Sequence, residues 1–579
     1  MFSRKVKIII TCVSRFRPSL HLVILALPLA FLALFYVYPL ISVVRISFVP
    51  GLLSQGAGIF ASLTEARALN IILFSVGQAT LSTALTLLLG LPMAHVFARY
   101  TFWGRGVWRA IATLPFVMPT VVVAAAFEAY IGSRGLLNTA LQALLGLSEP
   151  PIRLMNSLSM ILIAHVFYNV SVVIRIVGSF WSLINPQIEE VAASLGANRM
   201  QVFWRVTLGM ARPAIGAATL LVFVFSFTSF GVILLLGGPQ FATIEVEIYN
   251  QTAQLLRLDI ATSLAIVQLV ITLLLSLISA RLQARANVPL EATRPNLGGN
   301  RPSRSAHWLI VGVLIIIIGL VVAPLLTLLA RSLAWGSDDL LRFYRTLDQN
   351  PRGSFFFVPP LIAMRNSVTV AGLTALLALG FGLPLAYSVA NVRRGWLARV
   401  LDVALLLPLG TSALTLGLGY LVAFAAPIDL RTSPLLLPCA HTLIALPFVV
   451  RTLAPALRAI SPVLRESAAN LGASPLQVLR QIDLPLLRGP LLAALIFAFA
   501  ISLGEFGASV LIARPDYPTL PLVIARFLGQ PGALNYGQAL AMSAILMGVT
   551  VAATVGMERV GAQNIHYPHR VSGGSNTKP

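Results

Sequence analysis

The stretch PQIEEVAASLGANRMQVFWRVTLGMARP, residues 186–213, has a second copy in the chain, PVLRESAANLGASPLQVLRQIDLPLLRG, residues 462–489. The two copies align without a gap at an offset of 276 positions. Both are amphipathic islands in an otherwise apolar chain, and we interpret each as a docking element for a partner on the cytoplasmic side. The shared residues that we expect to form this element are Glu190, Ala192, Ala193 and Gly196 in the first copy and Glu466, Ala468, Ala469 and Gly472 in the second.

Each copy predicts two short helices joined by a sharp turn. A proline opens the first helix, where a missing N–H costs nothing. Gly196 and Gly472 stand where that helix should stop, because glycine readily adopts the left-handed conformation of a C-cap. Asn198 or Ser474 then serves as the N-cap of a second helix. The predicted knob is too polar for lipid and too well capped for a loose loop.

The composition places the chain in a membrane. It has 579 residues, of which 57% are hydrophobic and only 10% are charged, whereas soluble proteins carry about 25% charged residues. The net charge of +22 could suggest nucleic-acid binding. These charges instead flank apolar spans, as the positive-inside rule expects, so we expect no nucleic-acid partner.

Lysine and cysteine usage excludes several kinds of site. The only lysines are Lys5, Lys7 and Lys578, so the chain lacks the lysine that a P-loop uses to reach nucleotide phosphates. If ATP drives this protein, another chain must bind it. Cys12 and Cys439 form neither a disulfide framework nor a metal site. We therefore expect no cofactor, no metal and no catalytic residue, and the chain itself is not an enzyme.

Hydropathy predicts an all-α membrane protein with about twelve transmembrane helices, six on each side of a polar linker. The predicted segments are a tail (1–20), a first half (21–280), a linker (281–306), a second half (307–557) and a tail (558–579). The spans are expected near 20–40, 70–96, 109–131, 158–180, 214–236, 261–280, 307–330, 366–391, 399–425, 434–455, 490–513 and 537–557. The basic loops favour cytoplasmic N- and C-termini, while the loop 237–260, with Glu245 and Glu247, is assigned to the outside.

The two halves are repeats of one another. Residues 75–94 align with residues 367–386 at an offset of 292, and Phe230-Gly231 matches Phe506-Gly507 at an offset of 276. Because each half has six spans and both docking elements lie on one side, the repeat is parallel, with its pseudo-two-fold axis along the membrane normal. We expect a path for solute at this axis.

The docking elements resemble the EAA loops of the permeases of ATP-binding-cassette (ABC) importers. The second copy has Ser467 in place of the first alanine of the pattern, and the first copy has Val191 and Gly209 in place of an alanine and a proline. The resemblance implies a type I (MetI-like) permease of a prokaryotic inner membrane. It also implies two copies of an ATPase subunit that receive the two loops, and an extracytoplasmic solute-binding protein.

The fusion of two halves in one chain resembles the thiamine and ferric-iron permeases. Residues 162–169, 229–240, 503–507 and 518–522 look closest to the thiamine permease, although the acidic-Phe-Gly signature is also found in ferric permeases. Thiamine and ferric iron therefore both remain open. Permeases for phosphonate, sulfate/molybdate or polyamine, and a secondary transporter of twelve spans, are the alternatives.

Two carboxylates are candidates for the solute path, since ionisable residues inside a membrane are often functional. Glu505 falls within the eleventh predicted span and Glu128 toward the outer end of the third. Either could attract a cation that passes through. The alternative for each is a carboxylate that is hydrogen-bonded for packing only. His95, His165 and His441 are isolated in spans and show no metal-ligand spacing.

Overall fold

The computed structural model of the chain describes residues 18–48, 66–286, 302–334, 338–350, 357–391, 408, 410–425 and 429–563. The regular elements of these residues are helices, which confirms the all-α prediction. Eleven of the helical segments there are long and apolar enough to cross a membrane. In such a segment the backbone groups are satisfied internally, as lipid requires. Most of the predicted linker and both extreme tails fall outside the described residues.

The first sequence half supplies the helices up to α15. They are α2 (Pro18–Leu32), α3 (Tyr38–Phe48), α5 (Ala66–Arg99), α6 (Arg105–Thr113), α7 (Thr120–Ile131), α8 (Leu136–Leu145), α9 (Leu158–Leu183), α10 (Pro186–Ser194), α11 (Arg199–Gln201), α12 (Leu208–Phe227), α13 (Gly231–Leu236), α14 (Ile244–Tyr249) and α15 (Leu258–Ala286). Three of them are continued by short helical segments of other types: the π-helices η1 (Ala33–Val37) and η3 (Val202–Thr207), and the 3-10 helix η2 (Leu114–Val117).

The second sequence half repeats this order. Its helices are α16 (Arg304–Ile317), α17 (Ala323–Ser332), α18 (Arg342–Arg345), α19 (Pro360–Asn391), α21 (Ala413–Ala423), α22 (Leu436–Ala459), α23 (Pro462–Asn470), α24 (Pro475–Val478), α25 (Leu484–Gly504), α26 (Gly507–Ile512), α27 (Leu520–Leu528) and α28 (Ala533–Gln563). The π-helical segment η5 (Ile318–Val322) joins α16 to α17, and the π-helical segment η6 (Leu479–Asp483) joins α24 to α25.

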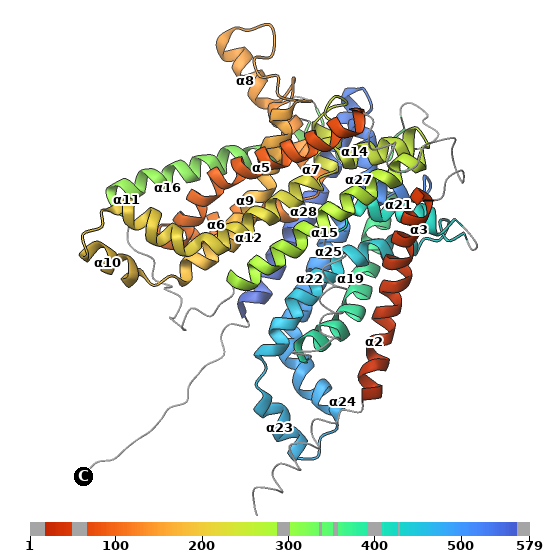
Figure 1. Cartoon of the computed structure of the whole chain (residues 1–579). Coiled ribbons are helices and arrows are strands. Elements are labelled where there is room, and N and C mark those ends of the chain that lie inside the picture. The colour runs from red at the N-terminus through yellow and green to blue at the C-terminus, as the bar shows by residue number, and fades with distance from the viewer. Residues whose placement is uncertain are drawn as a thin grey trace, which may run out of the picture.

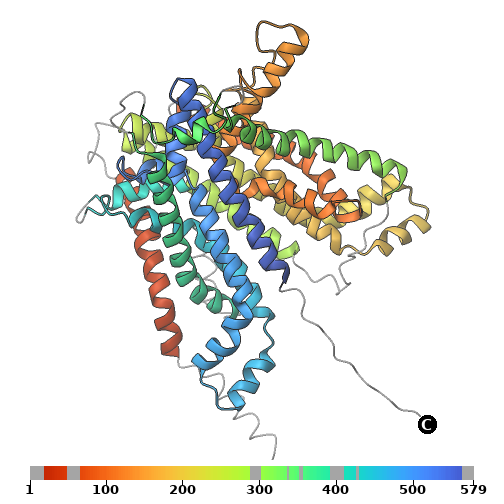
Figure 2. The ribbon, with the colours of Figure 1, turned by 180° about the vertical axis from the view of Figure 1, so that it is seen from behind.

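The first span of each sequence half packs against the other half. Helices α2 and α3 lie along α19 and α21 (Figure 1), and the rings of Phe31 and Phe381 stack with centroids 4.4 Å apart. In return, α16 and α17 lie against α5, α6 and α7 of the first half (Figure 2). Ile310 and Val313 share a buried cluster with Met93 there. Each spatial unit thus contains one span from the other sequence half.

Three predicted spans are not continuous helices. The prediction of single helices over 214–236 and 490–513 is wrong, because α12 ends at Phe227 before α13, and α25 ends at Gly504 before α26. The third span, predicted over 109–131, is interrupted by η2 and by Pro119, which cannot donate a backbone hydrogen bond. Of the span predicted over 399–425, α21 is the described helix.

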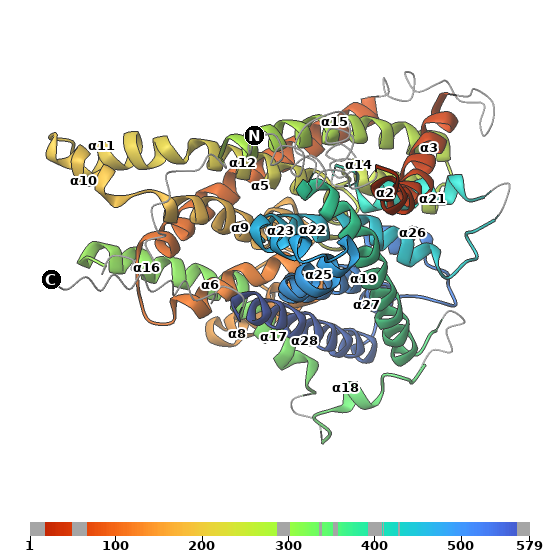
Figure 3. The same cartoon turned by 90° about the horizontal axis from the view of Figure 1, so that it is seen from below.

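The two units form arms that diverge from a shared region and end in the docking elements. Helices α10 and α11 lie at the end of one arm, and α23 and α24 lie at the end of the other (Figure 1). Helix α8 projects from the opposite end of the molecule. Viewed from below, the second arm is seen nearly end-on with α23 toward the viewer, while the first arm extends sideways to α10 and α11 (Figure 3). The docking elements therefore lie at the far ends of the two arms, away from α8.

Candidate functional site: two knobs and a central cavity

Each docking element folds into a helix, a glycine turn and a second helix, as the sequence predicted. Gly196 has φ +92° and Gly472 has φ +87°. In the first knob the N–H of Ala197 donates to the carbonyl of Ala192, and that of Gly196 donates to Ala193. The second knob repeats both bonds. This pattern is the Schellman motif, which satisfies carbonyls at a helix C-terminus and needs a left-handed residue.

The second helix of each knob begins at the predicted N-cap. Asn198 and Gln201 exchange hydrogen bonds between their side chains and backbones, at 2.9 and 2.8 Å. Ser474 and Gln477 do the same at 2.7 and 3.4 Å. Both are capping boxes, which satisfy orphan N–H groups at a helix start. The two turns are therefore fixed from both sides.

The knobs present their surfaces outward rather than to the spanning helices. Neither α10 nor α23 contains a buried residue. Glu190 and Glu466 are exposed, and the apolar side chains at the tips, Leu195 and Leu471, are 83% and 89% exposed. Each knob therefore presents a leucine side chain and a carboxylate at the surface of the protein.

An ion pair ties each knob to its arm, and the sequence analysis missed both. In the first knob Glu189 pairs with Arg99 at the end of α5 and accepts a hydrogen bond of 2.7 Å from Thr207. In the second, Arg465 Nε lies 2.8 Å from Asp483 Oδ1. The offset of 276 that aligns the knobs also aligns residue 189 with 465 and 207 with 483, so opposite charges at aligned positions were the available signal.

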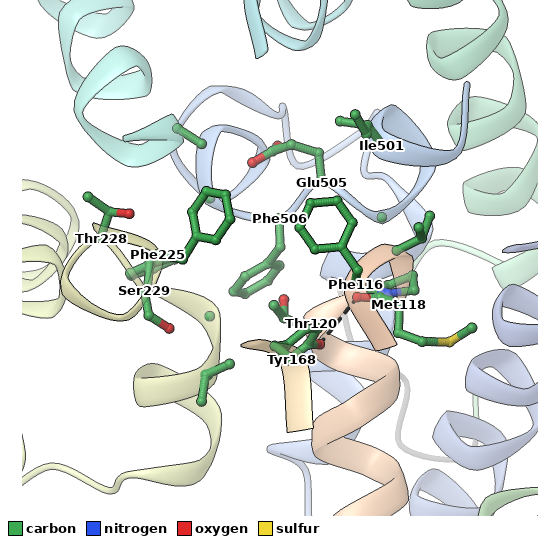
Figure 4. Close-up of a pocket in the computed structure, with 18 of the residues that line it drawn as sticks. Phe116, Met118, Thr120, Tyr168, Phe225, Thr228, Ser229, Ile501, Glu505 and Phe506 are labelled. Carbon is green, nitrogen blue, oxygen red and sulfur yellow. Dashed lines mark hydrogen bonds between the residues drawn. The ribbon is translucent and has the colours of Figure 1, made fainter. Parts of the chain in front are cut away.

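A cavity of about 370 Å³ lies between the two halves, in the shared region where the arms meet. Residues of both halves surround it (Figure 4): Thr120 and Ser229 come from the first, and Glu505 from the second. Seven of its lining residues carry phenyl or phenol rings. The rings are those of Phe116, Tyr168, Phe225, Phe230, Phe448, Phe497 and Phe506.

Glu505 lines this cavity but lies at a helix break rather than within a span. Its carboxylate accepts hydrogen bonds from the N–H groups of Ala508 and Ser509, at 2.9 and 3.1 Å, and so caps α26. His441 Nε2 lies 3.1 Å from Glu505 Oε2, and the side chain is 9% exposed. Both carboxylate oxygens therefore already have partners from the protein.

The structure does not bring Glu128 together with Glu505. Glu128 lies on α7 and lines two other cavities, of about 540 and 840 Å³. Arg153 and Asn156 share the first of these with it, and Arg331 and Tyr536 share the second. Glu128 therefore stands outside the central cavity, at the end of α7 near α8.

Glu245, which the sequence assigned to an outer loop, is a buried residue of the central cavity. It lies on α14, its residue is 0% exposed, and Gln268 donates a hydrogen bond to its Oε1. The Ser412 hydroxyl lies near the same carboxylate. Glu247 on the same helix is also buried, and Arg67 lies 3.2 Å from its carboxylate. Both glutamates of this predicted outer loop are thus buried, because α14 packs against α5, α15 and α21.

Comparison with known proteins identifies the chain. The family described as "Binding-protein-dependent transport system inner membrane component" matches residues 86–335 and 382–562, which is more than half of the sequence. The chain belongs to this family. Both matched segments contain a knob, so this inner membrane component is a fused ABC-importer permease with both halves in one multi-pass chain.

Curated relatives have the same fused organisation along most of their length. The thiamine transport system permease protein ThiP of Brucella abortus is 28% identical over 79% of this chain and 81% of its own. The protein of that name from Haemophilus influenzae is 29% identical over 84% and 89% of the two chains, and that from Escherichia coli is 27% identical over 79% and 83%. A solved chain of a bacterial alginate importer is 20% identical over 50% of this chain, with a TM-score of 0.37.

Proposed function

We propose that this permease forms the membrane path for thiamine and that its two knobs dock into two copies of an ATPase subunit. The single observation that supports the solute is the aromatic cavity between the halves, in a chain whose relatives are named thiamine permeases. Thiamine combines an aromatic pyrimidine with a cationic thiazolium ring. Aromatic side chains bind such a solute by stacking and by cation–π attraction.

The proposal of two ATPase partners is supported by the two knobs, each of which has a glycine turn and an exposed tip. Each knob is held by caps on both sides and by an ion pair to its arm, so a force applied to the tip is transmitted to the spanning helices. The knob side is then the cytoplasmic side, in agreement with the basic loops, and the N- and C-termini are cytoplasmic. An extracytoplasmic solute-binding protein delivers thiamine at the opposite end.

The lining also favours thiamine over ferric iron. Hard metal ions prefer several oxygen ligands, whereas the central cavity is surrounded mainly by phenylalanine rings and aliphatic side chains. Of the two carboxylates in this lining, Glu505 is already bound to His441 and to the α26 N-terminus, and Glu245 Oε1 is bound to Gln268, so a single carboxylate oxygen, Glu245 Oε2, remains without a partner. An organic cation needs only one counter-charge and apolar contact.

Reconstitution tests the proposal. The chain is placed in proteoliposomes with its ATPase and binding protein, and uptake of radiolabelled thiamine and of ferric iron is measured. We expect ATP-dependent, vanadate-sensitive thiamine uptake that unlabelled ferric iron does not compete with. Uptake that stops when the proton gradient is collapsed while ATP persists would make the chain a secondary transporter, and uptake of iron alone would replace the solute.

A further inference from the structure

The two halves place one histidine each beside the helix breaks, at positions that the offset of 276 aligns. His165 lies on α9 and His441 on α22, and both are buried. The Nδ1 atom of each lies beside a serine hydroxyl, Ser82 at 2.9 Å and Ser502 at 2.7 Å. Both Nδ1 atoms thus have a serine partner, although the hydroxyl comes from α5 in the first half and from α25 in the second.

The other ring nitrogens differ. Nε2 of His441 lies 3.1 Å from both Glu505 Oε2 and Ser509 Oγ. The residues aligned with these two partners in the first half are Ser229 and Ile233, which are too short or apolar to replace them. Nε2 of His165 is consequently buried with no hydrogen-bond partner. The hydrogen-bonding position at Nε2 is therefore unoccupied at His165, whereas Glu505 and Ser509 occupy it at His441.

His165 is not the only such group on this wall. Thr120 Oγ1 and Glu245 Oε2 are also buried without a hydrogen-bond partner, and all three residues line the central cavity. Buried polar groups of folded proteins are normally hydrogen-bonded, so each exception calls for a bound partner. The three atoms belong to the first sequence half. The lining residues of the second half include the rings of Phe448, Phe497 and Phe506 and the carboxylate of Glu505. Both oxygens of that carboxylate already have hydrogen-bond partners within the protein.

We propose that the solute site is asymmetric: Glu245, His165 and Thr120 of the first half bind the polar groups of an aromatic organic cation, and the second half contributes chiefly aromatic and aliphatic surface. Glu245 Oε2 supplies the counter-charge, because a carboxylate in a site of low dielectric attracts a cation strongly. His165 Nε2 and Thr120 Oγ1 orient the ring through hydrogen bonds. This inference rests on the proposed function and names the residues that carry it out.

The test uses variants of the full chain, purified with its ATPase, and measures the dissociation constant of radiolabelled thiamine at equilibrium. Glu245→Gln keeps the shape of the side chain and removes its charge. Ser229→Glu gives His165 the carboxylate partner that His441 already has. We expect each change to raise the dissociation constant about 10- to 100-fold, the range for loss of a hydrogen bond to a charged group.

Thermal unfolding separates lost binding from damaged folding. Ser229→Glu should unfold at the same temperature as the unaltered chain or higher, since it satisfies a buried nitrogen while it closes the site. Ser229→Ala is its matched control and adds no carboxylate. Ser509→Ala is the control in the second half, because Ser509 does not line the cavity. Ser509→Ala should bind thiamine within about 3-fold of the unaltered chain, and Ser229→Ala should weaken binding less than Ser229→Glu does.

The outcomes distinguish the two proposals. If the unaltered complex imports thiamine but Glu245→Gln and Ser229→Glu bind it normally, the asymmetric wall is wrong, and its three atoms hold ordered water only. If the unaltered complex neither binds nor imports thiamine, the proposed function fails and the wall assignment fails with it. Weakened binding by Ser509→Ala equal to that of Ser229→Glu would also overturn the asymmetry.

Discussion

Arg465 and Asp483 form an ion pair, with Nε and Oδ1 2.8 Å apart. The aligned residues of the first half are Glu189 and Thr207, which are joined by a hydrogen bond. The acidic side chain lies on the knob in the first half and at the start of the following helix in the second. The Asp483 side chain is 1% exposed, whereas that of Arg465 is 23% exposed. Both halves thus fasten the first knob helix to the start of the following spanning helix. The attachment is present in both halves although the side chains that make it differ: a hydroxyl and a carboxylate in the first half, and a guanidinium and a carboxylate in the second.

Arg465→Ala should uncouple the second knob from its arm. It leaves the buried Asp483 carboxylate without its cation, and breaking a buried pair from one side costs about 3–5 kcal/mol. Thermal unfolding of the purified complex and uptake driven by ATP measure the loss. Removing both charges together, in Arg465→Met with Asp483→Leu, should recover most of the stability. An Arg465→Ala protein that unfolds and transports like the unaltered chain would exclude this role.

Gly196→Val and Gly472→Val should abolish coupling while the protein still reaches the membrane. A Cβ atom at either glycine meets nothing within 4 Å, so the effect comes from the backbone alone. A left-handed residue with a side chain costs about 1–2 kcal/mol, and valine is among the least tolerant. The measurement is ATP hydrolysis stimulated by the loaded binding protein. Gly209→Ala, also in open space but within α12, is the control and should keep the stimulation.

Cysteines at positions 31 and 381 should cross-link the first span to the second half. Phe31 and Phe381 are stacked with ring centroids 4.4 Å apart, so Phe31→Cys with Phe381→Cys, in a chain without Cys12 and Cys439, should give one linked peptide pair by mass spectrometry. Leu27→Cys replaces Phe31→Cys in the control, because Leu27 is 67% exposed on α2. Equal linkage in both proteins would contradict the exchange of first spans.

Glu505→Gln should reduce stability more than thiamine affinity. The substitution removes the charge that caps α26 and faces His441, and loss of such hydrogen bonds costs about 1–3 kcal/mol. The dissociation constant of thiamine should change by less than about 3-fold, since both oxygens already have protein partners. Thermal unfolding and equilibrium binding on the same preparation measure the two quantities. A large loss of thiamine affinity at unchanged stability would instead indicate that Glu505 contacts the solute.

The knobs could be predicted from the sequence in detail because local rules decide them. The glycine turn at Gly472 and the capping box at Ser474 involve residues only a few positions apart, and their conformations follow from backbone sterics and from nearby hydrogen bonds. The repeat offset then located the second copy. The aligned ion pair at Arg465 was within reach of the same comparison, had the charges been matched by position rather than by identity.

The helix breaks could not be predicted from hydropathy. Residues 214–236 and 490–513 are predominantly apolar, and such a run has the same mean hydropathy whether its helix continues or stops. At Glu505 the break depends on a carboxylate that folds onto the N–H groups of the next helix. The burial of Glu245 could not be predicted for a related reason, since a glutamate in a short segment between two spans resembles a loop residue until α14 is seen packed against its neighbours.

By itself the sequence determined that this protein is an all-α membrane chain of two parallel repeats, each carrying a capped knob. Composition, repeat offset and turn chemistry are properties of short segments, and they need no partner in space. The tertiary structure alone decided that the first spans are exchanged between the halves, that Tyr36 meets Thr411 across 375 positions at 2.5 Å, and that Glu245 faces the central cavity. A helix that is apolar on all sides suits lipid and protein equally, so its neighbours follow from packing across the whole chain.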